Sequence, residues 1–156
     1  MTETAVNPAE TLAARLQGLE STGRFSPEVL EYVGDMAYNL LSQGRTEDAY
    51  RYYGFLAFYA PTDTRFIVGQ GICARELGRI AEARLLFDMA ACIRPDEPVH
   101  TLLSAECMLQ LGQVGEAVEA LELVRRYCAA SEGDEDVAQR ATALLELVSS
   151  HAASTE

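Results

Sequence analysis

Two histidines and four cysteines are the side chains of this chain best suited to metal binding or nucleophilic catalysis. They are His100, His151, Cys73, Cys92, Cys107 and Cys128. Zinc sites use closely spaced cysteine or histidine pairs, and the chain has neither a CxxC nor a nearby pair of histidines. We therefore expect no metal ion and no cofactor. The four cysteines are expected to be small, buried apolar side chains in a reducing compartment.

Other residues that could act on a substrate also have a simpler explanation. Gly69 and Gly71 lie inside a predicted helix, whereas a phosphate-binding loop requires glycines between a strand and a helix. The adjacent carboxylates Glu47 and Asp48 favour the positive end of a helix that begins there. No catalytic residues are predicted, and the chain is not expected to be an enzyme.

The elements that carry these residues repeat every 34 residues from Leu30 to Ser131. Five series of equivalent residues share this phase. They are Gly44, Gly78 and Gly112; Ala49, Ala83 and Ala117; Ala37, Gly71 and Ala105; Tyr53, Phe87 and Leu121; and Pro61 with Pro95. Small, large and proline residues at this period are typical of tetratricopeptide helix–turn–helix units. The sequence thus predicts an all-α fold, an α-solenoid of three such repeats over 30–63, 64–97 and 98–131.

Each repeat is expected to contain two helices that cross at small residues. The first unit begins at Ser26-Pro27, turns at Gly44, continues from Thr46-Glu47-Asp48 as cap and ends before Pro61. Large side chains would overpack the crossings, where the two small-residue series face each other. The last repeat is expected to end near Cys128.

Segments on both sides complete the predicted domain. Residues 1–29 hold a short amphipathic helix from Asn7-Pro8 to about Glu20, and its partner is either the first repeat or a second copy of the chain. Residues 132–156 hold a helix that covers the apolar end of the solenoid, followed by a frayed tail from His151.

An aromatic run lies on the second helix of the first repeat and exceeds what one helix can bury. It consists of Tyr50, Tyr52, Tyr53, Phe55, Phe58 and Tyr59. Tyr53 belongs to the core series. For the others, the sequence leaves two possibilities open, a contact between subunits and packing against the N-terminal helix.

The charge balance is strongly acidic, with 12 basic and 24 acidic residues and a net charge of −12. Such a surface repels nucleic acid and acidic membranes, so we expect no nucleic-acid binding and no stable membrane association. No apolar run approaches the roughly 20 residues that cross a bilayer. Residues 1–10 lack the pattern of a signal peptide, so we expect a cytoplasmic protein.

A candidate binding groove follows from the same periodicity. Stacked helix pairs form a concave surface, which the first helix of each unit is expected to line. Helical spacing selects Gly34, Tyr38, Leu41, Arg65, Val68, Ile72, Arg75, Val99, Leu102, Glu106 and Leu109. This stripe is mostly apolar where a solvent-facing stripe should be polar. It therefore indicates a site for an extended peptide with large apolar side chains.

The residues between the phase markers resemble one family. Ala37-Tyr38-Asn39, Glu47-Asp48-Ala49, Arg65-Phe66 and Ala105 to Gln110 are similar to the class II chaperones of bacterial type III secretion systems. The resemblance covers about Leu30 to Tyr127. It implies a cytoplasmic bacterial chaperone that binds an extended segment of hydrophobic translocator proteins in its groove and releases them at the secretion machinery. It also implies a homodimer through the N-terminal region.

Carried over by position, the family's groove falls on Tyr38, Leu41, Arg65, Val68, Ile72, Leu102, Glu106 and Leu109. Gly34 departs from the family, which often has a bulky residue there. The backbone of an extended cargo can bond to Arg65, Arg75 or Glu106. Two alternatives stay open, a tetratricopeptide chaperone of needle subunits that coats a helix, and a general adaptor that captures C-terminal carboxylates through groove cations.

Overall fold

The computed structural model describes residues 24–131 and 133–153, and the predicted helix over 7–20 lies outside them. The described part contains seven helices and no strand, which confirms the predicted all-α fold. The helices are α2 (Pro27–Ser42), α3 (Thr46–Tyr59), α4 (Thr64–Glu76), α5 (Ile80–Ile93), α6 (Pro98–Gln110), α7 (Val114–Ala130) and α8 (Glu135–Ala153).

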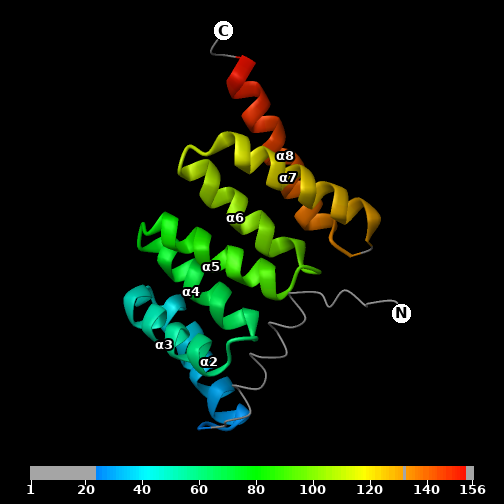
Figure 1. The fold of residues 1–156 in the computed structure, drawn as a ribbon. Coiled ribbons are helices and arrows are strands. Elements are labelled where there is room, and N and C mark those ends of the chain that lie inside the picture. Colours follow the sequence, from blue (N-terminus) through cyan, green and yellow to red (C-terminus); the bar gives the residue numbers. More distant parts are fainter. Residues whose placement is uncertain (1–23, 132, 154–156) are drawn as a thin grey trace, which may run out of the picture.

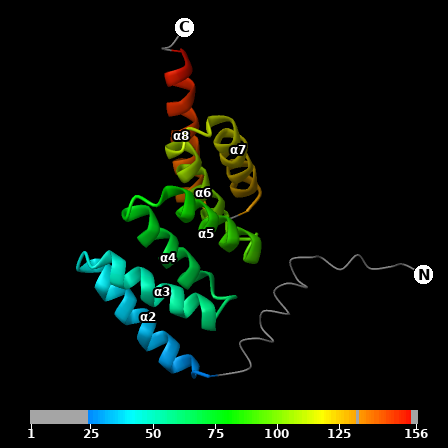
Figure 2. The same cartoon turned by 60° about the vertical axis from the view of Figure 1, so that its left-hand side comes forward.

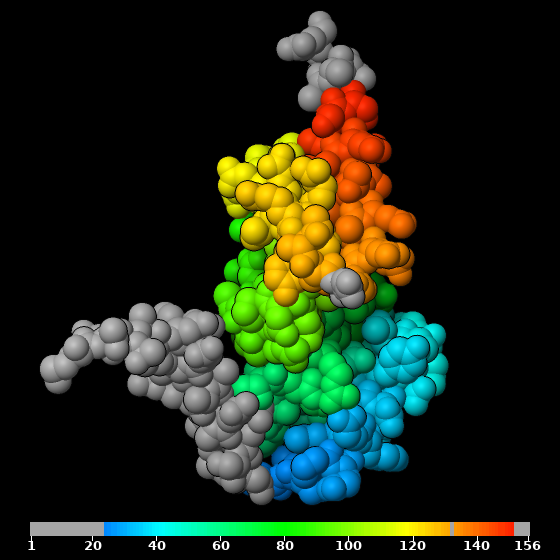
Figure 3. All heavy atoms as spheres, turned by 90° about the vertical axis from the view of Figure 1, so that its right-hand side faces the viewer, coloured from blue at the N-terminus to red at the C-terminus, as the bar shows by residue number. Residues whose placement is uncertain are grey.

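The helices form antiparallel pairs that stack in the order of the sequence. The pairs α2–α3, α4–α5 and α6–α7 correspond to the three predicted repeats, and each helix packs against the next one along the chain. Figures 1 and 2 show the stack rising from α2 and α3 at one end to α8 at the other. The space-filling view in Figure 3 shows the same order on one face. Two pairs of helices that are not consecutive also touch, α2 against α4 and α6 against α8.

The turn inside each pair has one geometry, repeated three times. Gly44, Gly78 and Gly112 have φ values of 76°, 76° and 75°, a region that glycine adopts without steric cost. In the first turn, the Arg45 amide donates to the Leu40 carbonyl at 2.9 Å, and the other two turns make the equivalent bond at the same distance. These bonds satisfy carbonyls that the helix end would otherwise leave open. The predicted turns are confirmed.

The helices of each pair cross at the small residues of the repeat. Ala49, Ala83 and Ala117 on the second helices are fully buried. A Cβ atom built on Gly71 would lie 2.6 Å from the Phe87 ring, closer than real contacts allow. Phe87 is itself fully buried. The crossing of α4 and α5 therefore has no room for a larger side chain.

The helix ends differ from the prediction in three details. Thr46 does not cap α3, because Arg45 occupies the cap position and the Thr46 hydroxyl donates to Glu76 at 3.0 Å. The last helix of the repeats continues to Ala130, beyond the predicted end near Cys128. Helix α8 extends to Ala153, so the chain is still helical at His151, where fraying was predicted.

Helix α8 covers the C-terminal end of the solenoid, as predicted. Ala141 on α8 is fully buried and packs in one cluster with Leu121 and Val124 of α7. Val137, Leu144 and Leu145 border this cluster. The apolar end of the third repeat is thus covered by the chain itself.

Candidate peptide-binding face

The predicted groove residues lie on the first helices of the three repeats, α2, α4 and α6. We call the surface that they form the first-helix face. Tyr38 is 64% exposed, and Arg65 and Val99 are also exposed. The half-buried members are Gly34, Leu41, Val68, Ile72, Arg75, Glu106 and Leu109. Ten of the eleven predicted positions therefore retain some contact with solvent.

Leu102 is the exception, because the structure places it in the core. Its side chain is 1% exposed and packs with Leu121 and Val124 in the cluster that α8 completes. The repeat pattern does not contain α8, so it assigns Leu102 to the open stripe. In this conformation the side chain cannot contact a bound peptide.

Gly34 lies beside a ring of the next repeat. A Cβ atom at Gly34 would meet the Cε1 atom of Phe66 at 3.1 Å, a tight contact. Phe66 is buried and belongs to the core of the first repeat. The missing side chain thus lets Phe66 pack close to the backbone of α2.

Arg65 links the first and second repeats through two carboxylates. Its guanidinium lies 2.6 Å from Asp63 and 2.6 Å from Glu31. The hydrogen bonds to Asp63 and Glu31 raise the pKa of Arg65. The Asp63 side chain also accepts from the Arg65 amide at 3.1 Å, which caps α4. Arg65 is therefore neutralised within the chain.

Glu106 links the second and third repeats to α8. Its Oε2 atom lies 3.1 Å from Arg75 of α4, and its Oε1 atom lies 2.6 Å from Arg140 of α8. The Glu106 side chain is 11% exposed. Arg65, Arg75 and Glu106 are the candidates for bonding a cargo backbone. In the structure, all three side chains already form ion pairs within the chain. The spacing of the sequence could not reveal partners on neighbouring repeats.

The aromatic run on α3 divides into a buried part and an exposed part. Phe55 and Tyr59 pack against Phe25, with ring centroids 5.3 Å and 4.9 Å apart respectively. Tyr53 is buried in the core, whereas Phe58 is 76% exposed and Tyr52 is also exposed. Phe25, just before α2, is thus the packing partner of two residues of the aromatic run. The sequence did not suggest this partner.

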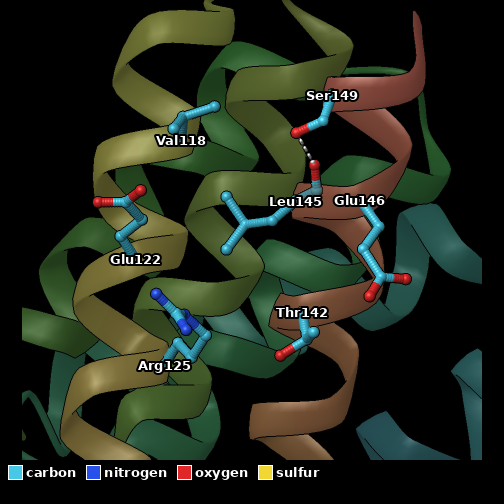
Figure 4. A pocket seen from close by; sticks show the side chains of 7 residues that line it. All are labelled: Val118, Glu122, Arg125, Thr142, Leu145, Glu146 and Ser149. Atoms are coloured by element: carbon cyan, nitrogen blue, oxygen red, sulfur yellow. Dashed lines mark hydrogen bonds between the residues drawn. The ribbon is translucent and has the colours of Figure 1, made fainter.

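A pocket lies between α7 and α8, at the covered end of the solenoid. This pocket of about 460 Å³ has Val118 and Leu145 as its apolar side chains. Figure 4 shows Glu122 and Arg125 on the α7 side and Glu146 on the α8 side. Its lining mixes both charges, and none of the predicted groove residues contributes to it. It is a less apolar candidate than the first-helix face.

The side chains considered for chemistry remain apart. Cys73, Cys107 and Cys128 are buried as predicted, but Cys92 is exposed on α5, contrary to the prediction. His100 is buried with its Nε2 atom 3.2 Å from Glu97, and desolvation lowers its pKa. Within residues 24–131 and 133–153, no group of three or more His, Cys, Asp and Glu side chains could hold a metal ion.

In the part of the chain that the structure describes, no helix is both long and apolar enough to span a bilayer.

Comparison with known proteins points to one group. No family model matches the chain. The crystal structure of PcrH in complex with the chaperone-binding region of PopD superposes with a TM-score of 0.76 and 30% identity, over 82% of this chain and 96% of that one. PcrH comes from Pseudomonas aeruginosa.

Two Yersinia proteins are also similar to this chain. The type III secretion chaperone SycD of Yersinia enterocolitica, solved with a peptide of the translocator YopD, gives a TM-score of 0.75 at 28% identity, over 81% of this chain and 97% of that one. The low calcium response locus protein H of Yersinia pestis is 28% identical over 123 residues, 79% of this chain and 73% of its own length. The chain therefore belongs to the family of type III secretion translocator chaperones.

Proposed function

We propose that this protein is a cytoplasmic secretion chaperone that binds an extended apolar segment of hydrophobic translocator proteins on its first-helix face. The observation that carries the proposal is the apolar stripe of α2, α4 and α6, which is exposed at Tyr38 and Val99 and half-buried at Ile72. Relatives support it, since PcrH was solved with the chaperone-binding regions of PopD and PopB, and SycD with a YopD peptide.

The physical basis is the burial of apolar surface. A protein destined to insert into a membrane exposes apolar segments in the cytosol, and covering them contributes about 25 cal/mol per Å² before ordering costs. Such holding requires no cofactor and no catalysis. A rigid aromatic side chain such as Tyr38 suits this role, because it offers a large contact area with little conformational freedom to lose.

The ion pairs of the first-helix face argue against capture of C-terminal carboxylates. That function favours free cations in the groove, whereas Arg65 and Arg75 are each held by carboxylates of this chain. Side chains of the bound segment, not its terminus, are therefore the expected determinants of binding.

We also propose a homodimer that forms through the segment 1–29, with the repeats over 30–131 and the cap over 132–156 as the rest of the domain. The dimeric relative supports it, since one SycD crystal structure is described as an alternative dimer. The exposed rings of Phe58 and Tyr52 offer further apolar surface near this end.

Co-expression with a translocator tests the main proposal. The wild-type chain should yield a soluble complex, and Tyr38→Glu combined with Val99→Glu should abolish it, because both charges enter the apolar stripe. A matched control is Leu85→Glu with Met89→Glu, two exposed positions on the second helix α5. Loss of the complex in the control variant but not in the first variant would refute binding of the translocator on the first-helix face.

A further inference from the structure

Two charged triads lie at opposite ends of α4 on the first-helix face. We propose that they fix the direction of the bound segment, with a basic side chain toward α2 and an acidic side chain toward α6 and α8. This inference rests on the proposed function and adds the charge pattern of the segment to it.

The triad near α2 is acidic. It consists of Arg65 with Asp63 and Glu31, each carboxylate 2.6 Å from the guanidinium. One cation between two carboxylates leaves a net charge of −1. Arg65 and Glu31 are both exposed, so a cation on a bound segment can approach these carboxylates from solvent.

The triad near α8 has the opposite composition. Glu106 is held between Arg75 at 3.1 Å and Arg140 at 2.6 Å, so one carboxylate between two cations leaves a net charge of +1. The Glu106 side chain is nearly buried, whereas the Arg140 side chain is 54% exposed. An acidic side chain of a bound segment would therefore meet arginine first.

The spacing of the triads suits a short extended segment. Arg65 and Arg75 are ten residues apart on α4, which corresponds to about 15 Å along the helix axis. This exceeds the Debye length of about 8 Å at physiological ionic strength, so each triad acts on its own surroundings. Val68 and Ile72 lie between them on the same helical stripe, both half-buried, and they form an apolar floor.

An extended chain advances about 3.3 Å per residue and alternates its side chains. A basic residue, an apolar residue and an acidic residue at every second position therefore point to one side and span about 13 Å. In one orientation each charge meets a triad of opposite sign. In the other orientation each charge of the segment faces a triad of the same sign. This repulsion disfavours the reversed orientation of the segment.

Two synthetic peptides test the proposal. Both carry the same symmetrical apolar pattern, and the basic and acidic residues exchange places between them. A photoreactive group sits beside the acidic residue in each. Labelling of the wild-type chain should fall within Pro98–Gln110 or Glu135–Ala153 for both peptides, because the orientation follows the charges. Labelling of Pro27–Ser42 by either peptide would overturn the proposal.

Affinities of variants provide a second readout. Arg140→Gln should weaken both peptides about twofold to fivefold at physiological salt, the range expected for one exposed charge pair. Arg126→Gln changes the net charge equally on the exposed side of α7 and should alter neither affinity. Equal effects of the two variants would contradict a local triad. If neither peptide binds the wild-type chain, the proposed function fails and the direction preference fails with it, whereas binding with label in α2 refutes only the direction.

Discussion

The glycine at the end of each first helix is required by its backbone conformation. Gly112 has a φ of 75° and open space around the position of a Cβ atom, so the constraint there is the backbone angle, not packing. Three residues further along the chain, Gly115 lies inside α7 and also has open space around it. The two positions thus separate the cost of a positive φ from the cost of glycine in a helix.

Substitutions at these two glycines should change stability in opposite directions. Gly112→Ala forces a side chain into the left-handed region and should lower the free energy of unfolding by about 1 kcal/mol. Gly115→Ala removes backbone freedom from the unfolded chain and should raise it by about 0.5 kcal/mol. Urea unfolding followed by circular dichroism measures both. Destabilisation of equal size at both positions would show that the turn geometry is not the cause.

The small residue at each crossing is limited by space. Ala83 is fully buried where α5 meets α4, so Ala83→Leu should destabilise the chain by about 1–3 kcal/mol through overpacking. Ala143→Leu on the exposed side of α8 is a control that should stay within about 0.5 kcal/mol. Thermal unfolding of the three proteins is the measurement, and an unchanged Tm for Ala83→Leu would contradict the packing argument.

The cysteines differ in their access to solvent. Burial raises the pKa of Cys73 to about 11, so its thiol stays protonated at pH 8 and is shielded as well. Cys92 is exposed on α5. A thiol reagent at pH 8 should modify one cysteine of the folded chain quickly, and Cys92→Ser should remove this reaction. Rapid reaction of the Cys92→Ser variant would show that a buried cysteine is accessible.

Helix α8 both covers the third repeat and changes what the first-helix face presents. It buries Leu102 and places Arg140 against Glu106. Neither effect follows from the 34-residue period, because α8 lies outside the repeats. The sequence predicted that a capping helix exists, since the end of a solenoid needs one, but it could not predict which residues that helix covers.

A charge placed in the cap should loosen one end of the stack. Ala141→Asp introduces an unpaired carboxylate at a fully buried position, a change that is strongly unfavourable. Because repeats contact only their neighbours, amide hydrogen exchange should increase in α6, α7 and α8 and remain slow in α2, α3 and α4. Ala143→Asp, two residues along on the exposed side of α8, is the control. Uniformly faster exchange throughout the chain would contradict a local cap.

The whole fold was largely predictable because residues within each repeat determine how its two helices turn and pack. Glycine, alanine and large apolar residues recur at fixed offsets, so the turns and crossings could be placed from the sequence. The candidate site was less predictable, because its polar members depend on partners 31 to 34 residues away, as in Arg75 with Glu106 and Arg65 with Glu31. Such pairs depend on how neighbouring repeats stack. The exposure of Cys92 likewise depends on which side of α5 meets its neighbours.

Site-specific cross-linking tests most directly whether the first helices bind the translocator segment. A photoreactive amino acid is introduced at Tyr38 or Val99 on the first-helix face, and at Leu85 or Met89 on α5 as the control, all four exposed. Each protein is then irradiated with the chaperone-binding segment of a translocator. We predict cross-links from Tyr38 and Val99 and none from Leu85 and Met89, whereas cross-links confined to Leu85 and Met89 would show that the segment does not bind the first helices.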